Sequence, residues 1–179
     1  MSASLRALRG DITTLEVDAI VNAANSRLDH VGGIARAIAL AAGPELTAAS
    51  LEAPPVPTGD NYATTAGDLK AKIVIHAVGP IWRGGQLKEA EILAATYRNA
   101  IAKAAELECN SVALPAISTG IYGYPVELAA PVALNAVLAA LQDHPEVRAA
   151  RFCLFSDTDY AAFSAAAQSG GVPVIEHES

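Results

Sequence analysis

Two loops rich in small residues contain most of the residues of this sequence that could bind a ligand. The first lies within NAANSRLDHVGGIARAI, residues 22–38, and the second is LPAISTGIYGYP, residues 114–125. Each follows a short apolar segment that predicts a strand and precedes a segment that predicts a helix. Loops at such corners present backbone N–H groups, and two of them side by side can bind one phosphate-bearing ligand. The sequence therefore predicts a nucleotide-type binding site.

The second loop carries hydroxyl groups beside its glycines. Ser118, Thr119 and Gly120 follow the strand predicted over 111–114, and Tyr122 lies two residues further on. Glycine permits a positive φ and has no Cβ, so N–H groups around Gly120 can converge on an anion. The hydroxyls add donors, and Tyr122 offers an aromatic face to a sugar. The same residues also suit an ordinary strand-to-helix turn, and their spacing alone does not separate the two interpretations.

The first loop combines glycines with amide side chains. Gly32 and Gly33 stand at the start of a helix predicted over 33–42, where free N–H groups and the positive end of the helix dipole attract anions. The amides of Asn22 and Asn25 follow the preceding strand and can hold a sugar hydroxyl or a water. A structural turn, closed by side-chain to backbone bonds, is the alternative.

A carboxylate near the start of the chain is a third candidate. Asp11 in RGDIT follows the first segment that predicts a strand. It can accept hydrogen bonds from the exocyclic amino group of a base, or it can cap a helix or turn. We expect His76, within the strand predicted over 72–78, to be structural, and we expect His144 and His177 to be solvated. No Cys/His spacing suits a metal, so neither a metal nor a cofactor is expected.

Composition limits the classes of protein to which the chain can belong. With 179 residues, 52% of them apolar, it suits one domain over residues 1–179. The net charge of −7, without a cluster of Lys or Arg, argues against binding to a nucleic acid backbone. No apolar stretch reaches the roughly 20 residues of a membrane span, and the first residues lack a signal-peptide core, so we expect a cytoplasmic protein. Cys109 and Cys153 are predicted to be buried thiols.

Predicted strands and helices alternate along the chain. The strands are expected at 18–21, 60–66, 72–78, 111–114, 147–155 and, at a sheet edge because of Pro173, 172–175. The helices are expected at 33–42, with a stop at Gly43 and Pro44, and at 87–107, 126–141 and 158–168. Residues 53–57 are predicted to form a surface turn. Alternation indicates a largely parallel sheet covered on both faces, with ligands at the carboxyl ends of its strands.

Taken together, five segments resemble the macro domain family, which binds ADP-ribose. The segments are GDIT (10–13), VDAIVNAAN (17–25), HVGGIARAI (30–38), IHAVGP (75–80) and LPAISTGIYGYP (114–125). They occur in the family's order and at its usual separations over nearly the whole chain. The resemblance implies a three-layer α/β/α sandwich with a mixed, mostly parallel central sheet.

The resemblance also implies a role for each candidate residue. It implies that Asp11 accepts from the adenine amino group, with the Ile12 backbone beside it, and that Phe155 stacks on the adenine. It implies that one side of the diphosphate is held by Gly32, Gly33 and Ile34. It implies that the other side is held by Ser118, Thr119, Gly120, Ile121 and Tyr122, and that the distal ribose meets Asn25. Ser156 stands where many relatives carry Asp.

The first loop bears on whether the chain is an enzyme. One hydrolytic subgroup carries an Asp in a GVDGAIH-like loop, and this chain has Ala35 there. Its HVGGIA is closer to the HGGGVA-like loops of another subgroup that still hydrolyses, with Val31 in place of a glycine. Because a β-branched residue avoids a positive φ, we expect Val31 to change the path of the loop.

Two residues are the predicted catalytic pair. We expect a water to be held between Asn25 and the diphosphate, with His30 nearby. The chain would then bind ADP-ribose or a mono-ADP-ribosylated protein and hydrolyse ADP-ribose from acidic side chains, or from related esters such as O-acetyl-ADP-ribose. The alternative is a binding module for ADP-ribose without catalysis.

Overall fold

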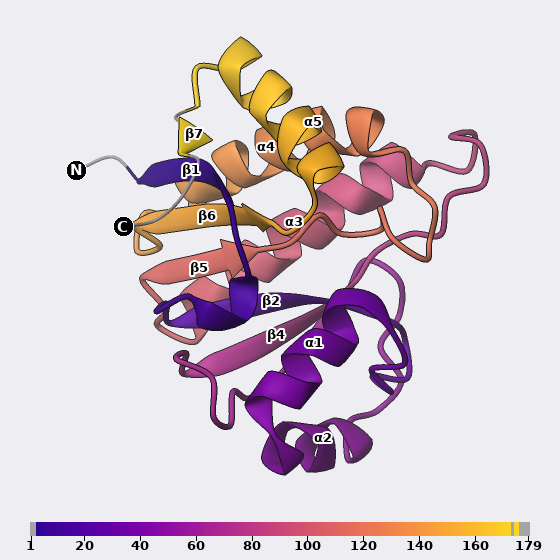
Figure 1. The fold of residues 1–179 in the computed structure, drawn as a ribbon, viewed down its shortest axis with the longest axis vertical. Helices are drawn as coiled ribbons and strands as arrows, with labels where there is room; N and C mark the ends of the chain where they lie inside the picture. Colours follow the sequence, from indigo (N-terminus) through magenta and orange to yellow (C-terminus); the bar gives the residue numbers. More distant parts are fainter. Residues whose placement is uncertain (1–2, 173, 176–179) are drawn as a thin grey trace.

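A computed structural model describes residues 3–172 and 174–175 (Figure 1). Its strands are β1 (Ser4–Arg9), β2 (Ala19–Ala24), β3 (Asn61–Thr65), β4 (Ile73–Val78), β5 (Ser111–Leu114), β6 (Ala149–Leu154) and β7 (Val174–Ile175). Its helices are the short 3₁₀ helix η1 (Ile12–Thr14), α1 (Gly33–Ala42), α2 (Pro44–Leu51), α3 (Glu89–Glu106), α4 (Val126–Asp143) and α5 (Asp157–Ser169). Pro173 and His177 lie outside the described residues.

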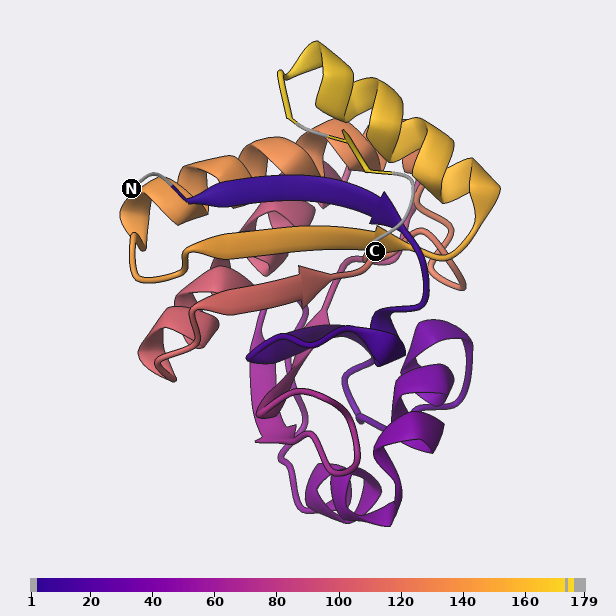
Figure 2. The ribbon, with the colours of Figure 1, turned by 60° about the vertical axis from the view of Figure 1, so that its left-hand side comes forward.

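The strands form one mixed sheet in the order β3-β4-β2-β5-β6-β1-β7 (Figure 2). Only the β3–β4 pair is antiparallel among the described pairs. β7 lies at the edge beside β1. The predicted α/β class and mostly parallel sheet are therefore confirmed.

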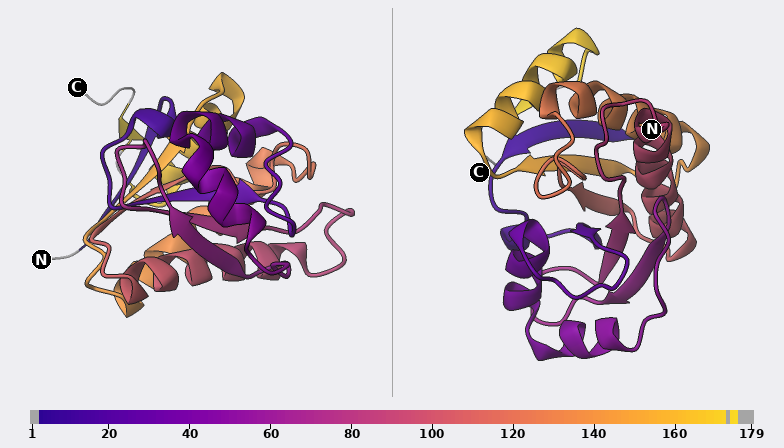
Figure 3. Two further views of the ribbon diagram at one scale, coloured as in Figure 1. Left: turned by 90° about the horizontal axis from the view of Figure 1, so that it is seen from below. Right: turned by 90° about the vertical axis from the view of Figure 1, so that its right-hand side faces the viewer.

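Period-two alternation in the strands fills the two faces of this sheet. In β2, Ala19 and Val21 pack into the larger core cluster with α3, α4 and α5, whereas Ile20 packs into a second cluster with α1 and α2. The sheet therefore lies between two helical layers, as Figure 3 shows from below. Successive side chains of a strand point to opposite faces of the sheet. In a parallel sheet both sets are apolar, so both faces need to be covered. The three-layer expectation is confirmed.

One α-helix was not predicted. Gly43, with φ 83°, ends α1 as expected, but Pro44 is the first residue of α2 rather than the end of helical structure. Proline is well tolerated at this position, because its missing N–H would have no partner inside the helix. Within α2 only Leu46 and Ser50 are buried, so the apolar stripe that usually reveals a helix is almost absent.

By its length and composition alone, helix α4 could cross a membrane. Half of that 18-residue window is buried inside the fold. Its buried residues, among them Leu134 and Val137, belong to the core cluster shared with α3 and α5. The apolar character of α4 is therefore explained by its place in the core. Cys109 and Cys153 are also buried, as predicted.

Candidate functional site

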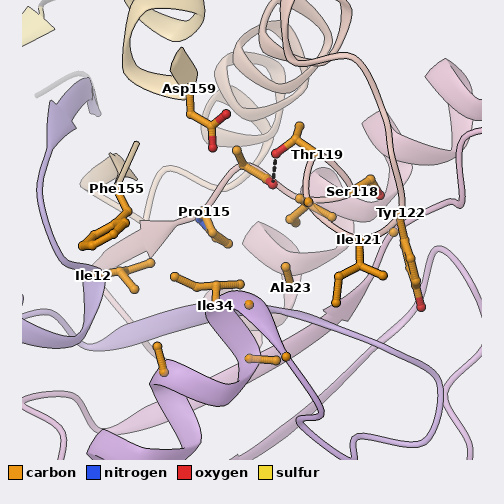
Figure 4. A pocket seen from close by; sticks show the side chains of 18 of the residues that line it. Ile12, Ala23, Ile34, Pro115, Ser118, Thr119, Ile121, Tyr122, Phe155 and Asp159 are labelled. Atoms are coloured by element: carbon orange, nitrogen blue, oxygen red, sulfur yellow. Dashed lines mark hydrogen bonds between the residues drawn. The ribbon is translucent and has the colours of Figure 1, made fainter. Parts of the chain in front are cut away.

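A cleft of about 600 Å³ opens at the carboxyl ends of five strands. It lies where β1, β2, β4, β5 and β6 run into their loops, the position that the sheet topology predicts for a ligand site. Figure 4 shows the two glycine-bearing loops on its walls, with Ile34 on one side and the segment from Ser118 to Tyr122 on the other. Of the candidate residues from the sequence, Asn22 and His30 are missing from its lining.

The first wall is the start of α1. Gly32 is the N-cap, and no side chain caps this helix end. The first four N–H groups of a helix have no partner within it, so those at Gly32, Gly33 and Ile34 are available to a ligand. Val31 is 69% exposed and is not among the described residues with positive φ; the left-handed positions of this loop are Leu28 (φ 52°), His30 (φ 55°) and Gly33. The loop therefore turns around Val31 without straining it.

The second wall is a row of backbone N–H groups. Among the described residues, none of the N–H groups from Ser118 to Tyr122 donates to a protein acceptor. The loop closes on itself through Tyr124 N–H, which donates to the Ser118 carbonyl at 2.9 Å, and Gly123 N–H, which donates to the Gly120 carbonyl at 3.0 Å. Consecutive free N–H groups in a turn form an anion-binding concavity.

The backbone of this second wall differs from our expectation at one residue. Gly120 does not have a positive φ; the left-handed positions are Ser118 (φ 69°) and Gly123 (φ 72°). Ser118 Oγ is buried and has no partner among the described residues, and a Cβ on Gly79 would lie 2.3 Å from it. Gly79, from the IHAVGP segment at the end of β4, is thus needed for this close approach.

Helix α3 supports the second wall from beneath. The hydroxyl of Tyr97 donates to the Pro115 carbonyl at 2.7 Å and accepts from Ile117 N–H at 2.8 Å. Burial raises the pKa of this phenol, so it stays neutral and keeps both bonds. The role of Tyr97 under the loop depends on contacts across 18 and 20 residues, which helical periodicity does not reveal.

A buried carboxylate supports the same wall from the side. Glu89 is 2% exposed and accepts three backbone N–H bonds, from Arg83, Gly85 and Leu87, at 2.7–3.1 Å. Burial alone would raise the pKa of Glu89, but these backbone donors lower it below its ordinary value. The loop that these three bonds shape carries Trp82, whose backbone N–H donates to the Tyr122 carbonyl at 2.9 Å.

The end of the cleft opposite Tyr122 combines an exposed ring with carboxylates. Phe155 directly follows β6, is 73% exposed, and lines the cleft beside Ile12 (Figure 4). Asp11 caps η1: its Oδ1 accepts from Thr13 N–H at 2.9 Å and from the Thr13 hydroxyl at 2.7 Å. Both of its predicted roles are therefore compatible, because Oδ2 is not used in the cap. Asp159, which the sequence did not single out, also lines this end.

Asn25 lies at the other end of the cleft and shapes its own loop. Its Nδ2 donates to Asp29 Oδ1 at 2.6 Å, and its Oδ1 accepts from Arg27 N–H at 3.2 Å. Asn25 therefore closes a structural turn, as one of its two interpretations predicts, and its side chain still lines the cleft. Asp29 places a carboxylate beside Asn25 that we had not included in the site.

His30 lies in a buried polar cluster behind the loop. Its Nε2 is 2.9 Å from Ser50 Oγ of α2, and its ring lies 5.3 Å from that of His76. We expected His30 to lie near a water held between Asn25 and the diphosphate. The left-handed backbone at His30 (φ 55°) instead coincides with a 9% exposed side chain that packs against Ser50 and away from the cleft.

His76 is structural, as predicted. Its Nδ1 lies 3.0 Å from Asn22 Nδ2, and its Nε2 lies 2.8 Å from Thr64 Oγ1, which donates to the Thr65 carbonyl. The donating amide and the donating hydroxyl place the single ring proton on Nε2. Burial, together with the charge of His30, lowers the pKa of His76 to about 3. Asn22 is fully buried in this cluster and takes no part in lining the cleft.

Comparison with known proteins agrees with this geometry. A family model for the Macro domain matches residues 21–133. The chain belongs to the macro domain family. A macro domain-containing protein of Chlorobaculum tepidum is 47% identical over 93% of this chain and 96% of its own length. An O-acetyl-ADP-ribose deacetylase of Cronobacter sakazakii is 44% identical over 91% of this chain and 93% of its own length.

Solved macro domain structures share the fold. A mutant of the Oceanobacillus iheyensis macrodomain, solved with ADPR, is 37% identical with a TM-score of 0.86, and the match covers 91% of both chains. The Trypanosoma brucei macrodomain in complex with ADP-ribose is 32% identical with a TM-score of 0.83, over 90% of this chain and 68% of that one. The sequence-based recognition of this macro domain is therefore confirmed.

Proposed function

We propose that this macro domain binds ADP-ribose in the cleft. The observation that carries the proposal is the pair of opposed walls, α1's uncapped N-terminus at Gly32 and the unpaired N–H groups from Ser118 to Tyr122. Between them a diphosphate finds donors on two sides without any cationic side chain. This suits a chain whose net charge is −7.

The rest of the cleft suits the two ends of the ligand, the adenosine and the distal ribose. Phe155 offers an exposed ring on which adenine stacks, with Asp11 Oδ2 as an acceptor for its amino group. Asn25, at the opposite end, meets the distal ribose. Related macro domains solved with ADPR and with ADP-ribose support the class of ligand.

The same site is proposed to hydrolyse ADP-ribosyl esters. A carboxylate released from the distal ribose is a good leaving group, since its conjugate acid has a pKa of about 4. For an ester on C1″, the C1″–O bond breaks with its electron pair on the leaving carboxylate, a water oxygen bonds to C1″, and the water's proton passes to solvent. The oxocarbenium-like transition state needs orientation more than a strong base. Asn25 supplies that orientation, while His30 acts only through the loop that it supports.

Relatives named O-acetyl-ADP-ribose deacetylase support an ester substrate. Substrates carrying ADP-ribose on Glu or Asp, on Ser and on Arg, together with O-acetyl-ADP-ribose, separate the linkages in one assay. We expect release from the acidic side chains or from the acetyl ester, and at least a tenfold slower release by Asn25→Ala. Unchanged turnover by Asn25→Ala would exclude this mechanism. The matched control is Asn135→Ala, on α4 and outside the cleft.

A reader without catalysis is the second candidate. The observation that favours it is that both ends of the Asn25 amide are already engaged, by Asp29 and Arg27, and that Ala35 offers no carboxylate. This candidate predicts saturable binding of ADP-ribose with no release from any of the substrates above. Binding measured in parallel distinguishes it from an inactive preparation.

A further inference from the structure

A half-buried carboxylate lines the cleft on a helix that the mechanism does not use. Asp159 lies in the first turn of α5, and Figure 4 shows its carboxylate aimed into the cleft between Phe155 and Thr119. Its backbone N–H donates to Ser156 Oγ at 3.1 Å, so the helix is capped by the serine. Burial raises the pKa of Asp159, the hydrogen bond from the Ser156 side chain partly opposes this rise, and the charge of Glu127 adds to it. A carboxylate in this setting gains from hydroxyl donors on a ligand.

The position of Asp159 corresponds to one part of the ligand. Adenine on Phe155 and a diphosphate at the second loop leave the adenosine ribose between them, facing Asp159. A carboxylate accepts hydrogen bonds from both hydroxyls of such a vicinal diol, as acidic residues do for ribose in dinucleotide-binding folds. It repels a phosphate at the same place.

No cation offsets this charge within the described lining of the cleft. That lining contains Asp11 and Asp159 and neither Lys, Arg nor His. Arg9, at the end of β1 and next to the lining residue Gly10, is in an ion pair with Asp157 at 2.5 Å. The cleft is thus divided: N–H donors at the diphosphate end and carboxylates at the adenosine end.

We propose that Asp159 reads the free 2′,3′-diol of the adenosine ribose and thereby excludes ligands that carry a 2′-phosphate there. The inference rests on the proposed function and narrows it to the class of ADP-ribose derivatives that lack this phosphate. Asp159 is then a specificity determinant that touches the ligand away from the reacting bond.

The test is calorimetric titration of the wild-type chain with ADP-ribose and with ADP-ribose 2′-phosphate. We expect the 2′-phosphate to bind about 100-fold more weakly, because it meets a like charge in a partly dehydrated site. Asp159→Asn should weaken ADP-ribose and strengthen the 2′-phosphate, reducing the ratio to about tenfold or less. Asp159→Glu should retain the discrimination. Asp143→Asn, exposed at the end of α4, removes the same charge away from the cleft and should change neither affinity.

The outcomes separate this inference from the proposed function. Equal wild-type affinity for both ligands overturns the inference and leaves ADP-ribose binding in place. An unchanged ratio in Asp159→Asn also overturns it, even if both affinities fall, because a purely structural role would weaken both ligands alike. Failure of the wild-type chain to bind ADP-ribose at all overturns the proposed function itself.

Discussion

Gly32 and Ile121 meet across the mouth of the cleft, where a Cβ on residue 32 would lie 3.1 Å from Cδ1 of Ile121. The two walls are therefore in contact above the space that the diphosphate is proposed to occupy. Gly32 has φ −173°, an extended conformation open to any residue, so the requirement for glycine here is one of space. Ile121 is 79% exposed and is able to move.

Gly32→Ala should weaken ADP-ribose binding by about 1 kcal/mol, because the added methyl pushes Ile121 outward and parts the two walls. Calorimetry measures this effect. The double variant Gly32→Ala with Ile121→Ala should regain most of the lost affinity, since the smaller side chain restores the space. An affinity of Gly32→Ala equal to that of the wild-type chain would show that the contact has no bearing on the ligand.

Phe155→Ala should weaken ADP-ribose binding by about 1–3 kcal/mol, the usual value of stacking a base on an aromatic ring. Because Phe155 is 73% exposed, its removal should leave the thermal midpoint nearly unchanged. Leu128→Ala, at a 54% exposed site on α4, is the matched control. Full affinity in Phe155→Ala would remove this ring from the site.

The buried histidines should make the fold sensitive to acid. The pKa of His76 is about 3 in the folded chain and near its ordinary 6.5 in the unfolded chain, so below pH 6.5 the unfolded chain takes up a proton that the folded chain refuses. Between pH 6.5 and about pH 3, each unit by which the pH falls should lower the free energy of unfolding by about 1.4 kcal/mol through this residue.

Urea unfolding between about pH 7 and about pH 5 measures that slope. His76→Gln loses bonds to Asn22 and Thr64 and should be less stable at neutral pH, but its stability should fall less steeply with acid. His30 is present in both chains, so the difference between the slopes reports His76 together with its coupling to His30. Parallel slopes would contradict the assignment of a neutral, buried His76.

Glu89→Gln should destabilise the chain by about 2 kcal/mol, because an amide oxygen cannot replace a carboxylate that accepts three buried N–H bonds. We also expect weaker ADP-ribose binding, since the loop that carries Trp82 holds the Tyr122 carbonyl. Glu91→Gln, exposed in the same first helical turn, is the control for the lost charge. Equal stability of the two variants would mean that Glu89 does not organise this loop.

Much of the fold could be predicted because the strands carry their own signal. Alternation such as that of Ala19, Ile20 and Val21 is local, and it indicates both the strand and the two covered faces of the sheet. Helix α2 was not predicted because it buries only Leu46 and Ser50. Local periodicity reveals a helix only when the helix packs on the core along a stripe of apolar side chains.

The walls of the cleft could be predicted for a similar reason, since glycines and hydroxyls at strand ends are readable in a short window. The orientation of single side chains could not. His30 adjoins the glycine loop in sequence, but its left-handed backbone accompanies a side chain directed to Ser50. Tyr97 and Asp159 reach the site from α3 and α5, and only the packing of those helices brings them there.

Titration of the wild-type chain with ADP-ribose is the most direct test of the account. Two opposed rows of N–H groups predict saturable binding of one ligand per chain, with a Kd in the range of about 1–100 µM. AMP, which lacks the diphosphate, should bind at least about tenfold more weakly. Absence of saturable binding at about 1 mM ADP-ribose, or equal affinity for AMP, would contradict the claim that the two walls form a diphosphate site.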